Sequence, residues 1–120
     1  MKDVTLISQR TREAWLLNEG PTLVGRDPAC DVQVLTAEAS RRHCLIVVED
    51  TGEVTISDLG SANGTHVNGW RIHGTLEIAS GDVITVAGVR FLCRVHEVPS
   101  EAETLRMAVE DHALRSARVA

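Results

Sequence analysis

The sequence predicts an all-β sandwich, and three observations support this fold class. First, 28 of the 31 Val, Ile and Thr residues lie at or before position 98, and β-branched residues favour strands. Second, this part of the chain is a series of short apolar runs. Third, turn-forming residues such as Asn-Gly, Asp-Pro and Gly-Asp separate the runs. A βαβ fold would need longer helical patterns between the runs, so we expect a sandwich or barrel.

We predict a strand at each apolar run. Val4–Ile7 and Val54–Ile56 alternate in polarity with their neighbours, as expected when one face of a strand meets the core. Leu45–Val48 is apolar on both faces, so its strand is predicted to be central. In chain order the runs are Val4–Ile7, Ala14–Leu17, Thr22–Val24, Val32–Leu35, Cys44–Val48, Val54–Ile56, Leu76–Ile78, Val83–Val86 and Arg90–Val95.

The composition changes after position 98, where five of the 12 alanines fall within residues 99–120. Ser100 and Glu103 have the spacing of a capping box, and apolar residues including Leu105 and Val109 then recur at a helical period. We therefore predict a β-sandwich domain at residues 1–98 and a C-terminal helical extension or linker at residues 99–120. The helix is expected to dock on the sandwich or to reach toward a partner or a neighbouring domain.

Length, charge and cysteine content restrict the class of protein. A chain of 120 residues has room for one domain, and no apolar run approaches the ~20 residues that cross a bilayer. No secretory signal is visible, and three widely spaced cysteines make a poor disulfide framework, so we expect a cytoplasmic protein with buried or half-buried thiols. The net charge of −5 argues against a general nucleic-acid surface. Any anion-binding site is therefore expected to depend on a few residues rather than on the overall charge.

Enzymatic chemistry and cofactor binding are not expected. The histidines show no metal-ligand spacing, and neither nucleotide-binding glycine motif occurs. His43 follows Ser40 closely and could be combined with Asp58 into a triad, but no nucleophile elbow accompanies them. We expect His43 to brace its loop by hydrogen bonds instead.

Three polar clusters between strands carry the candidate chemistry: residues 25–31, 40–43 and 58–69. In the first, Arg26 follows a glycine at a strand end, which suits an arginine that binds phosphate or carboxylate; pairing with Asp27 or Asp31 is the alternative. The second, Ser-Arg-Arg-His, combines a hydroxyl with two guanidinium groups. The third contains two Asn-Gly pairs and predicts a long, tightly turned, ordered loop.

Taken in order, these clusters resemble the forkhead-associated (FHA) domain. The matching segments are Gly25-Arg26, Ser40-Arg41-Arg42-His43, Asn63-Gly64-Thr65 and Val67-Asn68-Gly69, and the resemblance covers about residues 3 to 97. It implies a β-sandwich of about eleven strands whose loops, at one end, bind a phosphothreonine of a partner protein. The partner would be a substrate or member of a Ser/Thr kinase pathway.

The resemblance also implies a set of binding residues. Arg26 would contact the phosphate, Ser40 would donate its hydroxyl to it, and Arg41 would reach the phosphate or the peptide. Asn63 would hold the peptide backbone. Many relatives carry Thr or Ser immediately before this asparagine, whereas this chain has Ala62. Either Ser61 or a backbone N–H is expected to substitute, or the pocket is weaker by about one neutral hydrogen bond, about 0.5 to 1.5 kcal/mol.

Two questions of function and packing stay open at this point. The main interpretation is a non-catalytic phosphothreonine-recognition module in signalling; the alternative is a phospho-independent scaffold or oligomerisation module on the same fold. Trp70, next to the second Asn-Gly pair, is predicted to pack beneath the loop, and contact with a bound peptide is its alternative role.

Overall fold

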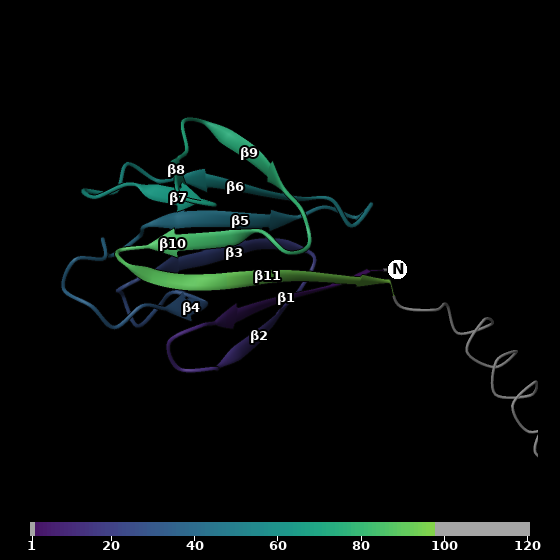
Figure 1. Cartoon of the computed structure of the whole chain (residues 1–120), viewed down its shortest axis with the longest axis horizontal. Coiled ribbons are helices and arrows are strands. Elements are labelled where there is room, and N and C mark those ends of the chain that lie inside the picture. Colours follow the sequence, from purple (N-terminus) through teal and green to yellow (C-terminus); the bar gives the residue numbers. More distant parts are fainter. Residues whose placement is uncertain (1, 98–120) are drawn as a thin grey trace, which may run out of the picture.

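The computed structural model describes residues 2–97, and these form eleven strands and no helix (Figure 1). The predicted C-terminal helix at residues 99–120 lies outside the described residues. The strands are β1 (Lys2–Ser8), β2 (Ala14–Leu17), β3 (Gly20–Gly25), β4 (Val32–Gln33), β5 (Cys44–Val48), β6 (Val54–Asp58), β7 (Thr65–Val67), β8 (Trp70–Arg71), β9 (Thr75–Ile78), β10 (Val83–Val86) and β11 (Val89–Glu97). The predicted all-β class is confirmed.

Two sheets make up the sandwich. One has six strands in the order β2-β1-β11-β10-β7-β8, and the other has five in the order β4-β3-β5-β6-β9. Every pairing is antiparallel except the short parallel contact of β3 with β4. The strand predicted to be central from its apolar run, β5, is the middle strand of the five-stranded sheet.

The core lies between the sheets, and strands such as β1 and β5 contribute alternate residues to it. In β1 the buried positions include Val4 and Leu6, and in β5 they are Cys44, Ile46 and Val48. The three cysteines are buried free thiols. Burial raises the pKa of the Cys44 thiol to about 12, so this side chain acts as a small apolar group.

The region predicted as one long loop contains two further strands. β7 and β8 form a hairpin whose turn is Asn68-Gly69, with φ values of 52° and 85°. Two consecutive positive φ values match the right-handed twist of a hairpin and explain the Asn-Gly pair. The prediction that Trp70 packs beneath the loop is wrong: its side chain is 81% exposed, because β8 is an edge strand with no neighbour to cover it.

Within residues 2–97, no helix of the length and apolar character needed to cross a bilayer occurs.

Candidate functional site

Three loops meet at one end of the sandwich. They join β3 to β4, β4 to β5 and β6 to β7, and they carry the three polar clusters. The Arg26 N–H donates to the Ser40 carbonyl at 3.0 Å, and the Ala62 N–H donates to the Ser40 hydroxyl oxygen at 3.0 Å. Ser40 thus joins the other two loops, although 14 residues separate it from Arg26 and 22 from Ala62.

Gly25 sets the spacing between the first two loops. A Cβ at this position would lie 2.2 Å from the carbonyl oxygen of Arg41, far inside van der Waals contact. The absence of a side chain therefore lets the two backbones approach, and the Asp27 N–H donates to the same carbonyl at 3.1 Å. This explains why glycine precedes Arg26: the close approach brings Arg26 beside Ser40.

The guanidinium of Arg26 is positioned but not neutralised. Its Nε donates to the Ala39 carbonyl at 3.0 Å, which leaves the two terminal nitrogens available to an anion. Within residues 2–97 no ion pair joins Arg26 to Asp27 or Asp31; the Asp27 carboxylate accepts the Ala29 N–H and the Asp31 carboxylate accepts the Leu23 N–H. Arg26 is exposed, as a ligand-binding side chain must be.

The Ser40 hydroxyl is oriented by the third loop. Its oxygen accepts the Ala62 N–H, so its own proton remains to be donated elsewhere. The N–H of Ala62 itself is thus engaged with Ser40 rather than open to a ligand.

Asn63 follows Ala62, whose N–H donates to the Ser40 hydroxyl oxygen. Its Nδ2 donates to the Glu38 carbonyl at 2.9 Å, and this bond orients the amide so that Oδ1 can accept a further N–H. Arg41 is exposed and its backbone carbonyl lies against Gly25; no side-chain bond holds its guanidinium within the described residues. The structure therefore brings Arg26, Ser40 and Asn63 together, with Arg41 following Ser40 in the same loop.

Ser61 is not part of this group. Its side chain is 7% exposed and its hydroxyl donates to the Asp58 carboxylate at 2.5 Å. Asp58 also accepts the Thr65 hydroxyl at 2.7 Å and the backbone N–H groups of Gly60 and Ser61 at 3.0 Å each. Ser61 therefore stabilises the third loop from within, and its predicted contact with ligand has no support in this geometry.

Partial burial raises the pKa of Asp58, but the hydrogen bonds from Ser61, Thr65 and Gly60 outweigh it and hold that pKa below its ordinary value. A depressed carboxyl pKa stabilises the fold fully above the unfolded-state value, and this contribution is lost as the pH falls through the folded-state value. Asp58→Asn should therefore lower the free energy of unfolding at pH 7 by about 1 to 3 kcal/mol. Urea titrations at pH 7 and at a pH below the ordinary carboxyl range measure this difference in the free energy of unfolding between the variant and wild type. The difference should be smaller at the lower pH. An equal difference at the two pH values would show that the loss does not come from the charge of Asp58.

His43 connects the second and third loops beneath this surface. Its ring is 0% exposed; Nδ1 accepts the Ser40 N–H at 3.1 Å and Nε2 lies 2.8 Å from the Gly64 carbonyl. Because Nδ1 is an acceptor, Nε2 carries the proton and donates it. The expectation that His43 braces its loop agrees with these contacts.

The nearest acidic groups do not occupy the site. The Thr36 hydroxyl donates to the Glu38 carboxylate and holds its pKa below the ordinary value, and Asp27 and Asp58 are bonded as described. Among residues 2–97, no group of three or more His, Cys, Asp or Glu side chains could hold a metal ion. The loop ends therefore present arginine charge and oriented donors, which suit a small multivalent anion.

The turn between β10 and β11 also reaches this end of the sandwich, which the sequence did not predict. A pocket of about 400 Å³ beside Asn63 is lined by Glu38, Gly64, His66, Thr85, Ala87 and Gly88. Ala87 and Gly88 have φ values of 50° and 80°, and Ala-Gly is a weak turn signal. Their approach to Asn63 depends on the pairing of β10 with β7, which local sequence does not encode.

Comparisons with known proteins point to one family. The family model for the FHA domain matches residues 22–87. The chain is 35% identical over 80 residues to the FHA domain-containing protein PS1 of Arabidopsis thaliana, covering 64% of this chain and 5% of that protein. It is 33% identical over 78 residues to the glycogen accumulation regulator GarA of Mycolicibacterium smegmatis, covering 65% of this chain and 48% of GarA.

A solved structure from work on phosphothreonine-dependent FHA domain interactions superposes with a TM-score of 0.75. It is 30% identical in sequence, and the match covers 80% of this chain and 99% of that one. The match thus covers nearly all of that solved domain. By contrast, this chain spans less than half the length of PS1 and of GarA.

Proposed function

Because this chain belongs to the FHA domain family, we propose that it is a recognition module for phosphothreonine in a partner protein, without catalytic activity of its own. FHA domains are phosphopeptide-binding interaction modules rather than enzymes. The observation that carries the proposal is the meeting of Arg26, Ser40 and Asn63 at one loop surface, with their remaining donors and acceptors unoccupied. The unit that acts is residues 1–98.

Each side chain has a part in the proposed recognition. The terminal nitrogens of Arg26 bind two phosphate oxygens, and the Ser40 hydroxyl donates to one of them. Arg41 adds positive charge or contacts the peptide. Asn63 uses Oδ1 to accept an N–H of the peptide backbone, and the residues after the phosphothreonine extend toward the pocket beside Asn63. A phosphate carries about −1.5 to −2 charge near pH 7, so these few donors can offset the chain's net acidity locally.

The proposed partner is a protein phosphorylated by a Ser/Thr kinase, in the cytoplasm. The free thiols of the three cysteines support this compartment, since reduced cysteines are typical of it.

The direct test is binding of a phosphothreonine peptide library to the domain, followed by titration of the selected peptide with and without its phosphate. We expect saturable binding that phosphatase treatment abolishes. Equal binding of both forms would instead support the phospho-independent scaffold.

Ser40→Ala, titrated with the same peptide, should weaken binding about ten- to hundredfold, because one hydrogen bond to a charged group contributes about 1.5 to 3 kcal/mol. Its effect on unfolding should be small, since the exposed Ala62 N–H can bond water instead. Ser61→Ala is the matched control: it removes the same hydroxyl from the neighbouring loop and should cost stability while leaving most of the affinity. The reverse order of the two affinities would place Ser61 at the phosphate and remove Ser40 from it.

A further inference from the structure

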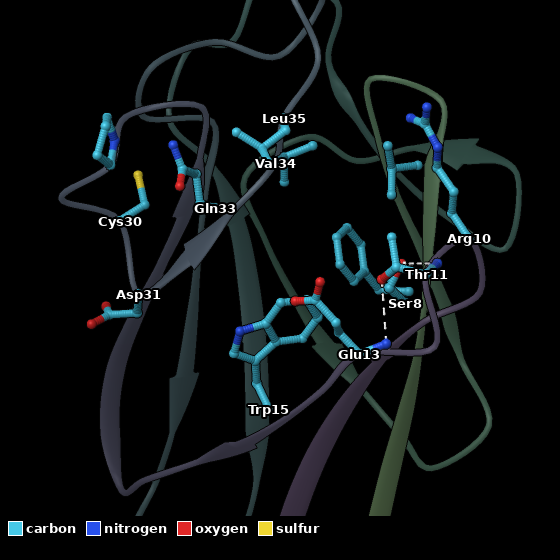
Figure 2. Close-up of a pocket in the computed structure, with 13 residues that line it drawn as sticks. Ser8, Arg10, Thr11, Glu13, Trp15, Cys30, Asp31, Gln33, Val34 and Leu35 are labelled. Carbon is cyan, nitrogen blue, oxygen red and sulfur yellow. Dashed lines mark hydrogen bonds between the residues drawn. The ribbon is translucent and has the colours of Figure 1, made fainter.

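The two faces of the six-stranded sheet have different surroundings. Figure 2 shows Ser8 and Trp15 pointing into a groove of about 510 Å³ between the edge strands β2 and β4, on the core side of the sheet. Successive residues of a strand point to opposite faces, so their neighbours Ile7 and Leu16 lie on the outer face. Leu16 is 62% exposed, and the part of the chain that the structure describes has no helix to cover this face.

Strand pairing arranges the outward side chains in rows across the sheet. One row crosses β11, β10, β7 and β8; we call it the arginine row, and it consists of Arg90, Thr85, His66 and Arg71. The neighbouring row crosses β2, β1, β11 and β10; we call it the apolar row, and it consists of Ala14, Ile7, Leu92 and Val83. Because neighbouring strands lie about 4.8 Å apart, each row is about 14 Å long. A charged strip therefore lies directly beside an apolar one.

The positive charge of the arginine row is not neutralised. Arg71 and Arg90 are both exposed, and neither forms an ion pair within residues 2–97. Among the outward residues of these six strands, the one carboxylate belongs to Asp3, which pairs with His96 two rows beyond the apolar row. Although the chain has a net charge of −5, the arginine row is thus kept apart from acidic side chains.

The other sheet does not share this charge. Its strands β3, β4, β5, β6 and β9 contain no arginine or lysine. One of its outward rows runs from Pro21 through Val47 and Thr55 and ends in the carboxylate of Glu77. Charges that serve solubility are usually of both signs and interspersed over a surface. The concentration of arginines on one face therefore favours a binding role.

The arginine row also reaches the recognition loops. Thr85 and His66 belong to the row and line the pocket beside Asn63 as well. Arg71, at the end of the row, lies against Gly64: a Cβ on that glycine would be 2.6 Å from the Arg71 Nε. The residues after a bound phosphothreonine, which are proposed to extend toward this pocket, would therefore arrive at the arginine row.

We propose that the outer face of the six-stranded sheet binds the partner segment that follows the phosphothreonine, and that this segment combines acidic and apolar residues. Arg71 and Arg90 bind its carboxylates, while Leu92 and Val83 pack against its apolar side chains. The arginine row has the length of about four extended residues. This inference rests on the proposed phosphothreonine recognition and adds the chemistry of the flanking segment.

The test compares extensions of one peptide. The phosphothreonine peptide selected from the library is extended at its C-terminus by a segment of Asp and Leu in equal number, and a second extension carries Asn in place of each Asp. Calorimetry gives the affinity of the full chain for both extended peptides and for the unextended one. Arg71→Gln and Arg90→Gln are compared with Arg10→Gln, the matched control, because Arg10 lines the groove rather than the outer face (Figure 2).

We expect the acidic extension to raise the affinity of the wild-type chain about tenfold over the unextended peptide, and the Asn extension to raise it by less than about twofold. Arg71→Gln and Arg90→Gln should each reduce the gain from the acidic extension about threefold, whereas Arg10→Gln should keep it. The net charge of the chain alone would weaken binding of the acidic extension, so a gain reports on local arginines.

Equal affinity for the two extended peptides, or the same gain in the Arg71, Arg90 and Arg10 variants, would overturn this inference. The unextended phosphopeptide, measured alongside, separates that result from a failure of the proposed function. If the unextended peptide bound the wild-type chain equally with and without its phosphate, the proposed function itself would be wrong, and this inference with it.

Discussion

Arg26→Ala is expected to reduce affinity for a phosphothreonine peptide by about 10² to 10⁴-fold, because two charge-assisted hydrogen bonds of about 1.5 to 3 kcal/mol each are lost. The fold should be retained, since the side chain is exposed and its one internal bond is to the Ala39 carbonyl. Arg26→Lys keeps the charge but not the planar fork, so it should recover only part of the affinity. Calorimetric titration of the selected peptide measures each value.

The control for Arg26 is Arg94→Ala, which removes the same charge from an exposed position of β11. Its effect on affinity should be small and should disappear at high salt, as expected of a distant charge. If Arg26→Ala and Arg94→Ala weakened binding equally, the phosphate would be attracted by net charge alone, and the proposed site would be wrong.

His43→Ala is expected to have the largest effect on stability among the site residues, about 2 to 4 kcal/mol in the free energy of unfolding. The fully buried imidazole fills space and satisfies both the Ser40 N–H and the Gly64 carbonyl. Because it ties the loop of Ser40 to the loop of Asn63, the phosphopeptide affinity of the folded variant should also fall, by about tenfold, or 1.4 kcal/mol. Urea unfolding and peptide titration measure the two effects.

His96→Ala is the control for His43. His96 lies in β11, is exposed and does not line the pocket beside Asn63, so its removal should change neither stability nor affinity much. A variant of His43 that lost stability but bound peptide as tightly as wild type would show that the two loops keep their positions without the imidazole bridge.

Some features of the fold could be predicted from the local sequence, and others could not. The apolar run at Leu45–Val48 predicted the middle strand correctly, although only one face of β5 is buried in the core and Leu45 and Val47 on the other face are half-buried. Asn68-Gly69 predicted positive φ values correctly, because few other residues adopt them. By contrast, β7 and β8 were missed, since strands of three and two residues are too short for alternation to be visible.

Residues whose role depends on a distant partner were less predictable. Ser61 and Ser40 are both serines in polar loops, yet one hydroxyl is bonded to Asp58 and the other accepts the Ala62 N–H at the loop surface. Trp70 was expected to be covered and is exposed, because whether a hairpin lies at the edge of a sheet depends on the pairing of other strands.

The sequence by itself determined the all-β class, the order of most strands along the chain and the three clusters that resemble an FHA domain. These features follow from backbone preference, alternation of polarity and turn chemistry, which act over a few residues. Only the tertiary structure decided that Arg26, Ser40 and Asn63 meet, that Ser61 is turned to Asp58, and that a groove remains open between β2 and β4. Those outcomes depend on contacts between segments far apart in the chain, such as the close passage of Gly25 and Arg41, and local sequence does not specify them.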